Sequence, residues 1–94
     1  MKTFMVERSL QGISMADLAA AQKAAIRAAE ELSWQGTPVA YLRSTFVPET
    51  GHCMCLFTAH DVASVKAAND KARLPYFRIV PVLDLAPQAT PALP

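Results

Sequence analysis

The sequence of 94 residues predicts an α+β domain in which one strand–helix–strand unit is followed by a second. Three observations lead to this prediction. Two apolar runs flank the turn sequence Pro48–Gly51, a pattern typical of a hairpin. Alanine-rich segments with helical periodicity lie on each side of that hairpin. Short apolar runs at 3–8 and 76–85 then supply the first and last strands.

The first helix is predicted over Met15–Leu32, because alanine, the strongest helix former, dominates this segment. Ser14 and Asp17 form a variant of the capping box, which marks a helix start. A glycine and a proline follow soon after Leu32, as expected beyond a helix end. We expect Trp34 to fold back over the core.

The hairpin is predicted to join an edge strand to a central strand. The first of the two mixes Arg43 and Ser44 with apolar and β-branched residues, which suits an exposed edge. The second, His52–Phe57, is apolar on both alternating sets of residues from Cys53 onward. A strand with two apolar faces is typical of a sheet centre.

The second helix is predicted from about Asp61 to Arg73, with Thr58 and Asp61 as a weak capping pair. A leucine-proline pair ends this helix, and a strand follows over Tyr76–Leu85. Pro81 cannot donate a ladder hydrogen bond, so we expect this strand at an edge or a bulge.

This order of elements is the ferredoxin-like arrangement β-α-β-β-α-β, with a four-stranded antiparallel sheet and two helices on one face. Strands one and three lie at the centre of such a sheet, and strands two and four at its edges. The opposite face is apolar enough to need cover, which predicts a homodimer, a dimeric α/β barrel. We assign residues 1–85 to this domain and residues 86–94, rich in proline and alanine, to a disordered tail.

The composition and net charge of the chain argue against several classes of function. Apolar residues make up 52% of the chain and charged residues 18%, which favours burial of surface against a partner. The net charge of +1 argues against a nucleic-acid binder, which needs a concentrated basic face. No run approaches the roughly twenty apolar residues of a membrane span. Cys53 and Cys55 lie on the same side of one strand, where a disulfide between them is geometrically poor, so we expect reduced thiols in a cytoplasmic protein.

Two polar residues interrupt the apolar stripes of the helices. Gln22 falls on the stripe of the first helix and Asn69 on that of the second, each seven residues after its start. We expect the two helices to run alongside each other in the same sense, which would bring both amides together as a small polar patch. The alternative is that each amide borders its buried stripe and faces water.

Further candidates lie on the strands. Glu7 could act as a general base if its side of the sheet lines a cleft, since burial raises the pKa of a carboxyl group. Tyr41 and Arg43 are expected on one side of the second strand, where they could orient an anionic ligand or join an edge-strand ion pair. The sequence shows no nucleophile–base–orienter trio and no glycine-rich phosphate loop.

A metal site is the remaining candidate. The two cysteines with His52 and His60 supply thiolate and imidazole groups, which suit zinc or nickel. His52, however, alternates to the opposite side of the strand from the cysteines, and His60 lies past the strand end. Because this spacing matches none of the usual zinc patterns, the structural interpretation of these residues is favoured.

Six short pieces carry a family resemblance through their order and spacing: Phe4–Arg8, Asp17–Ala21, Arg43-Ser44, Cys55–Ala59, Leu74-Pro75 and Arg78-Ile79. With them the chain resembles a family of small bacterial proteins of unknown function, over about Phe4–Leu83. That family includes nickel-binding members, and the resemblance implies a ferredoxin-like fold and a dimeric assembly.

The resemblance also locates a site. The nickel-binding members place histidines at the end of the first strand, in the first helix, and in or just after the second helix. Aligned with those positions are Arg8, Gln22, Asn69 and Leu74, none of which is a histidine. We therefore expect no metal cofactor, and a pocket near Arg8, Gln22 and Asn69 that suits an uncharged or anionic small ligand, or a purely structural hydrogen-bond network.

The favoured hypothesis is a non-enzymatic, homodimeric small-ligand-binding protein. One alternative is a small enzyme of the dimeric α/β-barrel type, oxygenase- or isomerase-like, in which Glu7, Tyr41, Arg43 or a histidine converges in a cleft. The other alternative is a metal-binding protein.

Overall fold

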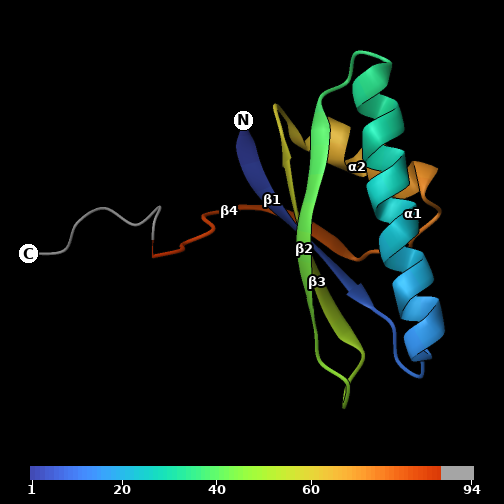
Figure 1. Cartoon of the computed structure of the whole chain (residues 1–94). Coiled ribbons are helices and arrows are strands. Elements are labelled where there is room, and N and C mark those ends of the chain that lie inside the picture. The colour runs from blue at the N-terminus through green and yellow to red at the C-terminus, as the bar shows by residue number, and fades with distance from the viewer. Residues whose placement is uncertain (88–94) are drawn as a thin grey trace, which may run out of the picture.

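The computed structural model describes residues 1–87 and contains a four-stranded antiparallel sheet with both helices on one face (Figure 1). The strands lie in the order β2-β3-β1-β4, so the first and third strands are central, as predicted. The elements are β1 (Lys2–Ser9), α1 (Met15–Trp34), β2 (Val39–Phe46), β3 (His52–Ala59), α2 (Val62–Lys71) and β4 (Arg78–Val82). This confirms the ferredoxin-like fold. The predicted tail at 86–94 lies largely outside the described residues.

Local side-chain contacts explain where the helices begin. The Ser14 hydroxyl accepts a hydrogen bond from the Asp17 backbone N–H at 3.1 Å, which caps α1 as predicted. The start of α2 differs from the prediction, because Asp61 rather than Thr58 is its N-cap and accepts from the Ser64 N–H at 2.9 Å. Thr58 is still part of β3, where its backbone belongs to the sheet.

The end of α2 has an unusual residue. Arg73 has a φ of 58°, and the Leu74 N–H donates to the Asn69 carbonyl at 3.1 Å. This is the Schellman arrangement, in which glycine normally occupies the left-handed position. The turn directs the chain through Pro75 and back to the sheet edge.

The core lies between the helices and the sheet. Phe4, Val6 and Phe57 are buried from the sheet side, and Val65 with small alanines is buried from the helices. Alanines let the helices approach the sheet closely, and burial of a side chain such as Phe57 contributes about 2–3 kcal/mol. On β3 every second residue from Cys53 to Ala59 is buried, whereas the alternate set is only half-buried. One face of the central strand is therefore covered within the chain and the other is not.

Two expectations about direction and orientation are wrong. The sheet is antiparallel in the order β2-β3-β1-β4, so β1 and β3 run in opposite directions. Each helix connects two parallel strands and must run opposite to them, so α1 and α2 are antiparallel to each other, not aligned in the same sense. Trp34 is 88% exposed rather than folded over the core. It is the last residue of α1, five residues after buried Ala29, which turns it away from the sheet.

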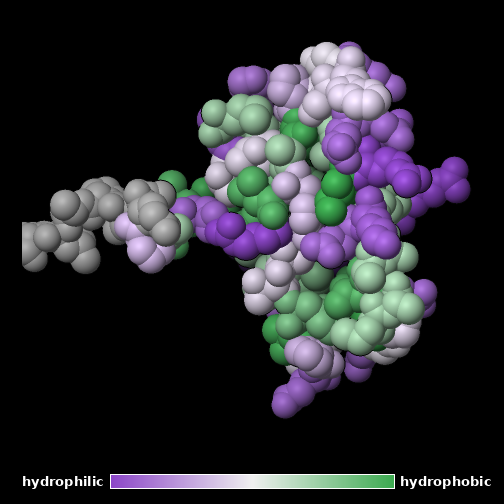
Figure 2. All heavy atoms as spheres, in the orientation of Figure 1, coloured by the Kyte–Doolittle hydropathy of each residue, from purple (hydrophilic) through white to green (hydrophobic). Residues whose placement is uncertain are grey.

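The edge strands carry irregularities. β2 pairs with β3 in a register that shifts between Tyr41 and Arg43, which marks a β-bulge at this point. β4 is shorter than predicted, and Pro81 lies within it opposite Phe4, on the sheet edge as expected. Figure 2 shows apolar surface gathered at the end of the molecule where α1 begins beside the hairpin. Within residues 1–87, neither helix is long and apolar enough to cross a membrane.

Candidate functional site

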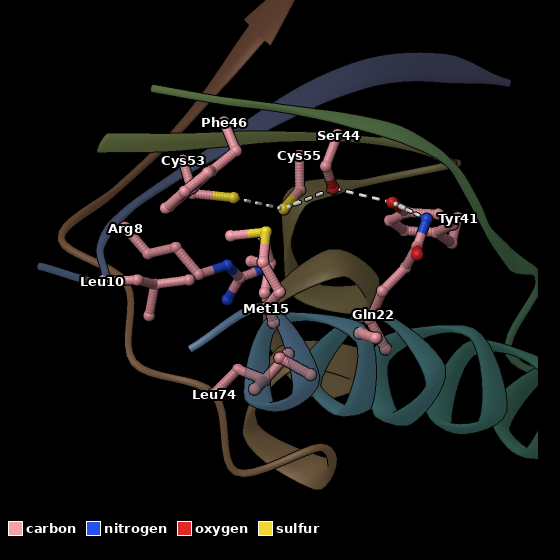
Figure 3. A pocket seen from close by; sticks show the side chains of 14 residues that line it. Arg8, Leu10, Met15, Gln22, Tyr41, Ser44, Phe46, Cys53, Cys55 and Leu74 are labelled. Carbon is pink, nitrogen blue, oxygen red and sulfur yellow. Dashed lines mark hydrogen bonds between the residues drawn. The ribbon is translucent and has the colours of Figure 1, made fainter. Parts of the chain in front are cut away.

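A cavity of about 260 Å³ lies between the first half of α1 and the sheet (Figure 3). Most of its lining is apolar, and polar or sulfur-bearing side chains reach it from β1, β2, β3 and α1. The lining residues are Arg8, Leu10, Met15, Leu18, Ala19, Ala21, Gln22, Ala25, Tyr41, Ser44, Phe46, Cys53, Cys55 and Leu74. An apolar cavity with a few convergent polar groups is typical of a small-ligand site.

Arg8 is the charged residue of this cavity. Its side chain is buried, with 2% exposure, and it reaches from β1 to the end of α2. Nη2 donates to Asn69 Oδ1 at 2.8 Å and Nη1 to the Pro75 carbonyl at 3.2 Å. Among residues 1–87, no ion pair includes Arg8. A buried guanidinium is thus held by neutral acceptors alone, and its charge has no carboxylate to balance it.

Asn69 fixes the position of Arg8. It is fully buried, and its Nδ2 donates to the Val65 carbonyl at 2.9 Å while its Oδ1 accepts from Arg8. The helix backbone therefore orients the amide, and the amide orients the guanidinium. A polar residue on the buried stripe of α2 is explained by this contact.

A chain of hydrogen bonds lines the β2 wall of the cavity. Gln22 Nε2 donates to the Tyr41 hydroxyl at 3.0 Å, and that hydroxyl lies 2.7 Å from Ser44 Oγ. Ser44 Oγ donates to Cys55 Sγ at 2.9 Å. Tyr41 also packs edge to face on Phe57, with ring centroids 5.5 Å apart, so its hydroxyl is held in place.

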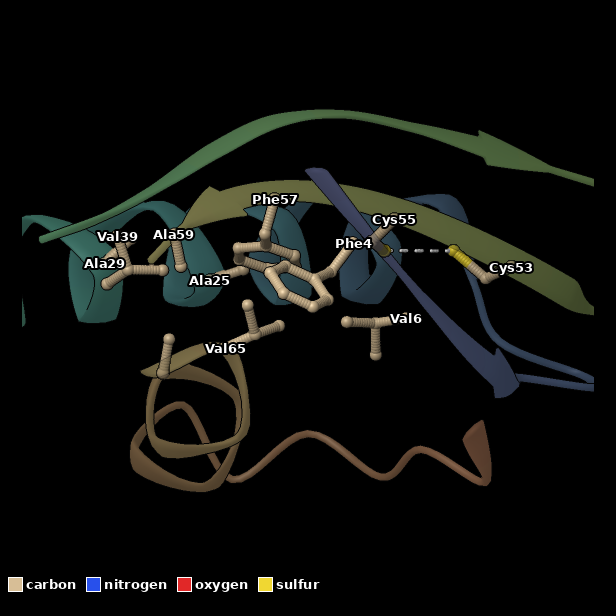
Figure 4. Close-up of a cluster of buried hydrophobic side chains, with 11 residues drawn as sticks. Phe4, Val6, Ala25, Ala29, Val39, Cys53, Cys55, Phe57, Ala59 and Val65 are labelled. Carbon is tan, nitrogen blue, oxygen red and sulfur yellow. Dashed lines mark hydrogen bonds between the residues drawn. The ribbon is translucent and has the colours of Figure 1, made fainter. Parts of the chain in front are cut away.

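The two cysteines form the floor of the cavity. Their Sγ atoms are 3.7 Å apart, and both side chains are buried (Figure 4). Figure 4 shows the pair at one end of the row of buried core side chains. Burial, followed by the influence of Cys55, raises the pKa of the Cys53 thiol from 9.0 to about 11, although nearby Arg8 lowers it. Cys53 is therefore an uncharged thiol at neutral pH.

The structure brings together some of the predicted site residues and separates others. Arg8, Gln22 and Tyr41 line the cavity, and Leu74 joins them. Asn69 contacts the site through Arg8. The two amides have different hydrogen-bond partners, because Gln22 donates to Tyr41 on the exposed side whereas Asn69 accepts from Arg8 in the interior.

The expectation that Tyr41 and Arg43 share one side of β2 is wrong. The bulge adds one residue between them, so Tyr41 pairs opposite Phe57 on the helix-covered face while Arg43 pairs opposite Leu56 on the other. Arg43 forms an ion pair with Asp84 there. The same bulge places Ser44 in the cavity, opposite Cys55.

Glu7 also lies away from the cavity, on the sheet face that the helices leave open. Its carboxylate is 3.5 Å from His52 Nε2 and 3.5 Å from Arg78 Nε. The His52 ring stacks on Phe77 with centroids 6.2 Å apart. These contacts form a cluster around the largely buried Glu7, on the open face of the sheet, that does not reach the ligand cavity. Within residues 1–87, no three His, Cys, Asp or Glu side chains are grouped to hold a metal ion.

Ser44 and Met15 are cavity residues that sequence reasoning missed. In a regular strand Ser44 would be an exposed edge residue. No sequence signal predicts the bulge that turns it inward. The helical pattern predicts Met15 as the first residue of the buried apolar stripe of the first helix. In the structure it is 64% exposed and borders the cavity. The common side of the two cysteines was predictable, but the cavity beside them was not.

Comparison with known proteins supports the fold and identifies a family. The family model described as "Nickel responsive protein SCO4226-like" matches residues 4–82. A crystal structure of SCO4226 from Streptomyces coelicolor A3(2) superposes with a TM-score of 0.74 at 21% identity, covering 89% of this chain and 99% of that one. No curated protein matches the chain.

Proposed function

We propose that this chain, which belongs to the SCO4226-like family of nickel responsive proteins, is a non-enzymatic, homodimeric protein that binds a small anionic ligand, because a buried cation, Arg8, lines its cavity. The ligand occupies the cavity between α1 and the sheet, with its anionic group toward Arg8.

The unbalanced charge of Arg8 is the observation that carries the proposal. A buried cation without a counter-ion costs free energy, and a carboxylate that enters the cavity reduces that cost. Two neutral acceptors already orient the guanidinium, so little ordering is needed when a ligand binds. A cavity of about 260 Å³ is small for a ligand site, which favours a compact organic anion.

The same residues argue against a nickel ligand. Three of the four positions that the family resemblance aligns with histidines, namely Arg8, Gln22 and Leu74, line this cavity. A guanidinium stays protonated and has no lone pair to give a metal, and an alkyl side chain cannot coordinate one either. We infer that this member keeps the location of the site and has side chains there that suit an anion in place of nickel-binding histidines.

Dimerisation and location are parts of the same proposal. The sheet face that the helices leave open carries half-buried Met5, Met54 and Leu56, and a second copy covers such a face most simply. The free thiols of Cys53 and Cys55 are the form that a reducing cytoplasm maintains.

The test uses benzoate as the probe and benzamide as its neutral counterpart, in calorimetric titrations of untagged protein. Benzoate is expected to bind more tightly than benzamide. Arg8→Met, which removes the charge and keeps most of the volume, is expected to weaken benzoate binding by about tenfold to a hundredfold, as for a lost charged hydrogen bond.

Arg43→Met is the matched control, because Arg43 lies on the opposite face and pairs with Asp84. It should leave benzoate binding unchanged. Equal benzoate affinity in wild type and Arg8→Met would contradict the proposal. Native mass spectrometry of the untagged protein adds an independent view, since a co-purified anion would appear as extra mass.

A further inference from the structure

Two thiols in the cavity remain without a role in the proposed function. Cys53 and Cys55 are two residues apart on β3, and their Sγ atoms lie 3.7 Å apart, facing the cavity. Neighbours on one face of a strand are poorly placed to close a disulfide. Two convergent thiols that do not pair are suited to hold one soft metal ion between them.

The distance between the sulfur atoms fits such an ion. With a metal–sulfur bond of about 2.3 Å, a separation of 3.7 Å corresponds to a sulfur–metal–sulfur angle of about 107°. An angle well below linear leaves room for a further ligand on the cavity side. Met15 reaches the same cavity from the opposite wall, with its side chain directed toward the sheet (Figure 3), and carries a thioether.

The surrounding groups favour a monovalent ion. Two thiolates and one monovalent cation carry a net charge of −1, which the buried guanidinium of Arg8 balances. A divalent ion would leave the charge of Arg8 unbalanced. Zinc also requires four ligands, and within residues 1–87 no three His, Cys, Asp or Glu side chains are grouped to supply them.

We propose that Cys53 and Cys55 form a binding site for the cuprous ion, with Met15 as the third ligand and Arg8 as the balancing charge. Ser44 supports the site, because its hydroxyl donates a hydrogen bond to Cys55 Sγ at 2.9 Å. On binding, two S–H bonds break and two Cu–S bonds form, and two protons pass to solvent. No electron is transferred. This site does not depend on the proposed small-anion function, although both use Arg8.

The experiment is an anaerobic titration of the full chain with Cu(I), kept reduced by ascorbate, in competition with bicinchoninate. Wild type is expected to bind one ion per chain. Cys53→Ser and Cys55→Ser should each weaken binding by more than about a hundredfold, beyond the usual loss from a supporting residue. Ser44→Ala and Met15→Leu should each weaken it by about tenfold.

Met54→Leu is the matched control, because Met54 lies between the two cysteines on β3 and is on the opposite face. It should leave the affinity for Cu(I) unchanged. Full Cu(I) binding by Cys53→Ser would overturn the proposal, as would equally tight binding of Zn(II) by wild type. If a serine variant does not fold, X-ray absorption spectroscopy of wild type with bound Cu(I) tests the site instead. A copper ion without sulfur ligands would contradict the proposal.

Benzoate titration of wild type, carried out beside the Cu(I) titration, separates the two proposals. A protein that binds Cu(I) but not benzoate would refute the anion proposal alone, and the reverse result would refute the copper site alone.

Discussion

Arg8 shows how one residue can be held in place without being neutralised. Its guanidinium is fixed by an amide oxygen from α2 and by the carbonyl of Pro75, so its geometry is as well determined as that of an ion pair. The charge nevertheless remains available to whatever enters the cavity. A carboxylate in place of Asn69 would have held the side chain equally well and removed that availability.

A double-mutant cycle between Arg8 and Asn69 tests this contact. Asn69→Leu leaves a buried donor of Arg8 without its partner and is expected to lower the free energy of unfolding by about 2 kcal/mol. Arg8→Met removes a buried charge but leaves Asn69 Oδ1 without its donor, so a smaller loss is expected. The double variant Arg8→Met/Asn69→Leu should recover most of the loss, as measured by urea unfolding. Additive losses would contradict the coupling.

The pKa of Cys53 predicts how stability changes in alkali. Below pH 9 both the folded and the unfolded chain keep this proton, and the stability is complete. Between pH 9 and about 11 the unfolded chain loses the proton and the folded chain keeps it, so stability falls as pH rises. The total loss from this group is roughly 2–3 kcal/mol.

Urea unfolding of wild type and Cys53→Ala under anaerobic conditions, at pH 8 and pH 10.5, measures this loss. The cavity created by the substitution costs the same at both values, so it cancels in the comparison. The difference in stability between the two proteins should shrink on going to pH 10.5. A difference independent of pH would show that the thiol is not perturbed.

At the scale of elements, the ends of the helices and the edges of the sheet carry most of the irregular features. α2 ends with Arg73 in a left-handed conformation, where an L side chain is disfavoured by roughly 1–2 kcal/mol relative to glycine. Arg73→Gly is therefore expected to raise the free energy of unfolding by about 1 kcal/mol.

Ala67→Gly is the control for that substitution, because it places glycine inside the same helix at an exposed position. It should lower the stability by about 1 kcal/mol. Thermal unfolding of the two variants should therefore shift in opposite directions. A shift of both in the same direction would mean that the Arg73 side chain itself stabilises the turn.

The sequence was sufficient to predict the order of elements, the central position of β3 and the edge position of β4. Each of these depends on a local pattern, such as the two apolar sets of β3 or the proline in β4. The bulge in β2 was not predictable, because strand alternation at Tyr41 and Arg43 looks regular and only pairing with β3 reveals the extra residue. The cavity follows from that bulge and from the approach of α1 to the sheet, so only part of the candidate site could be predicted.

The whole molecule exposes one face of its sheet, which leads to a prediction on assembly. Light scattering after size-exclusion chromatography should give the mass of a dimer. Leu56→Lys places a charge on the open face and should yield a folded monomer, because burying the unpaired charge in the interface would be costly. Ala20→Lys, on the exposed side of α1, is the control and should remain dimeric. A monomeric wild type would contradict the assembly part of the proposal.

The two edges of the sheet also limit how copies of the chain can meet. β2 is bent by its bulge, and β4 is a five-residue strand that contains a proline, so neither edge offers a long, regular row of free backbone groups. Strand addition from chain to chain, the route by which sheets grow into fibrils, would first require one of these edges to be remodelled. Crowded solutions of this protein should therefore form closed, countable assemblies rather than filaments without end.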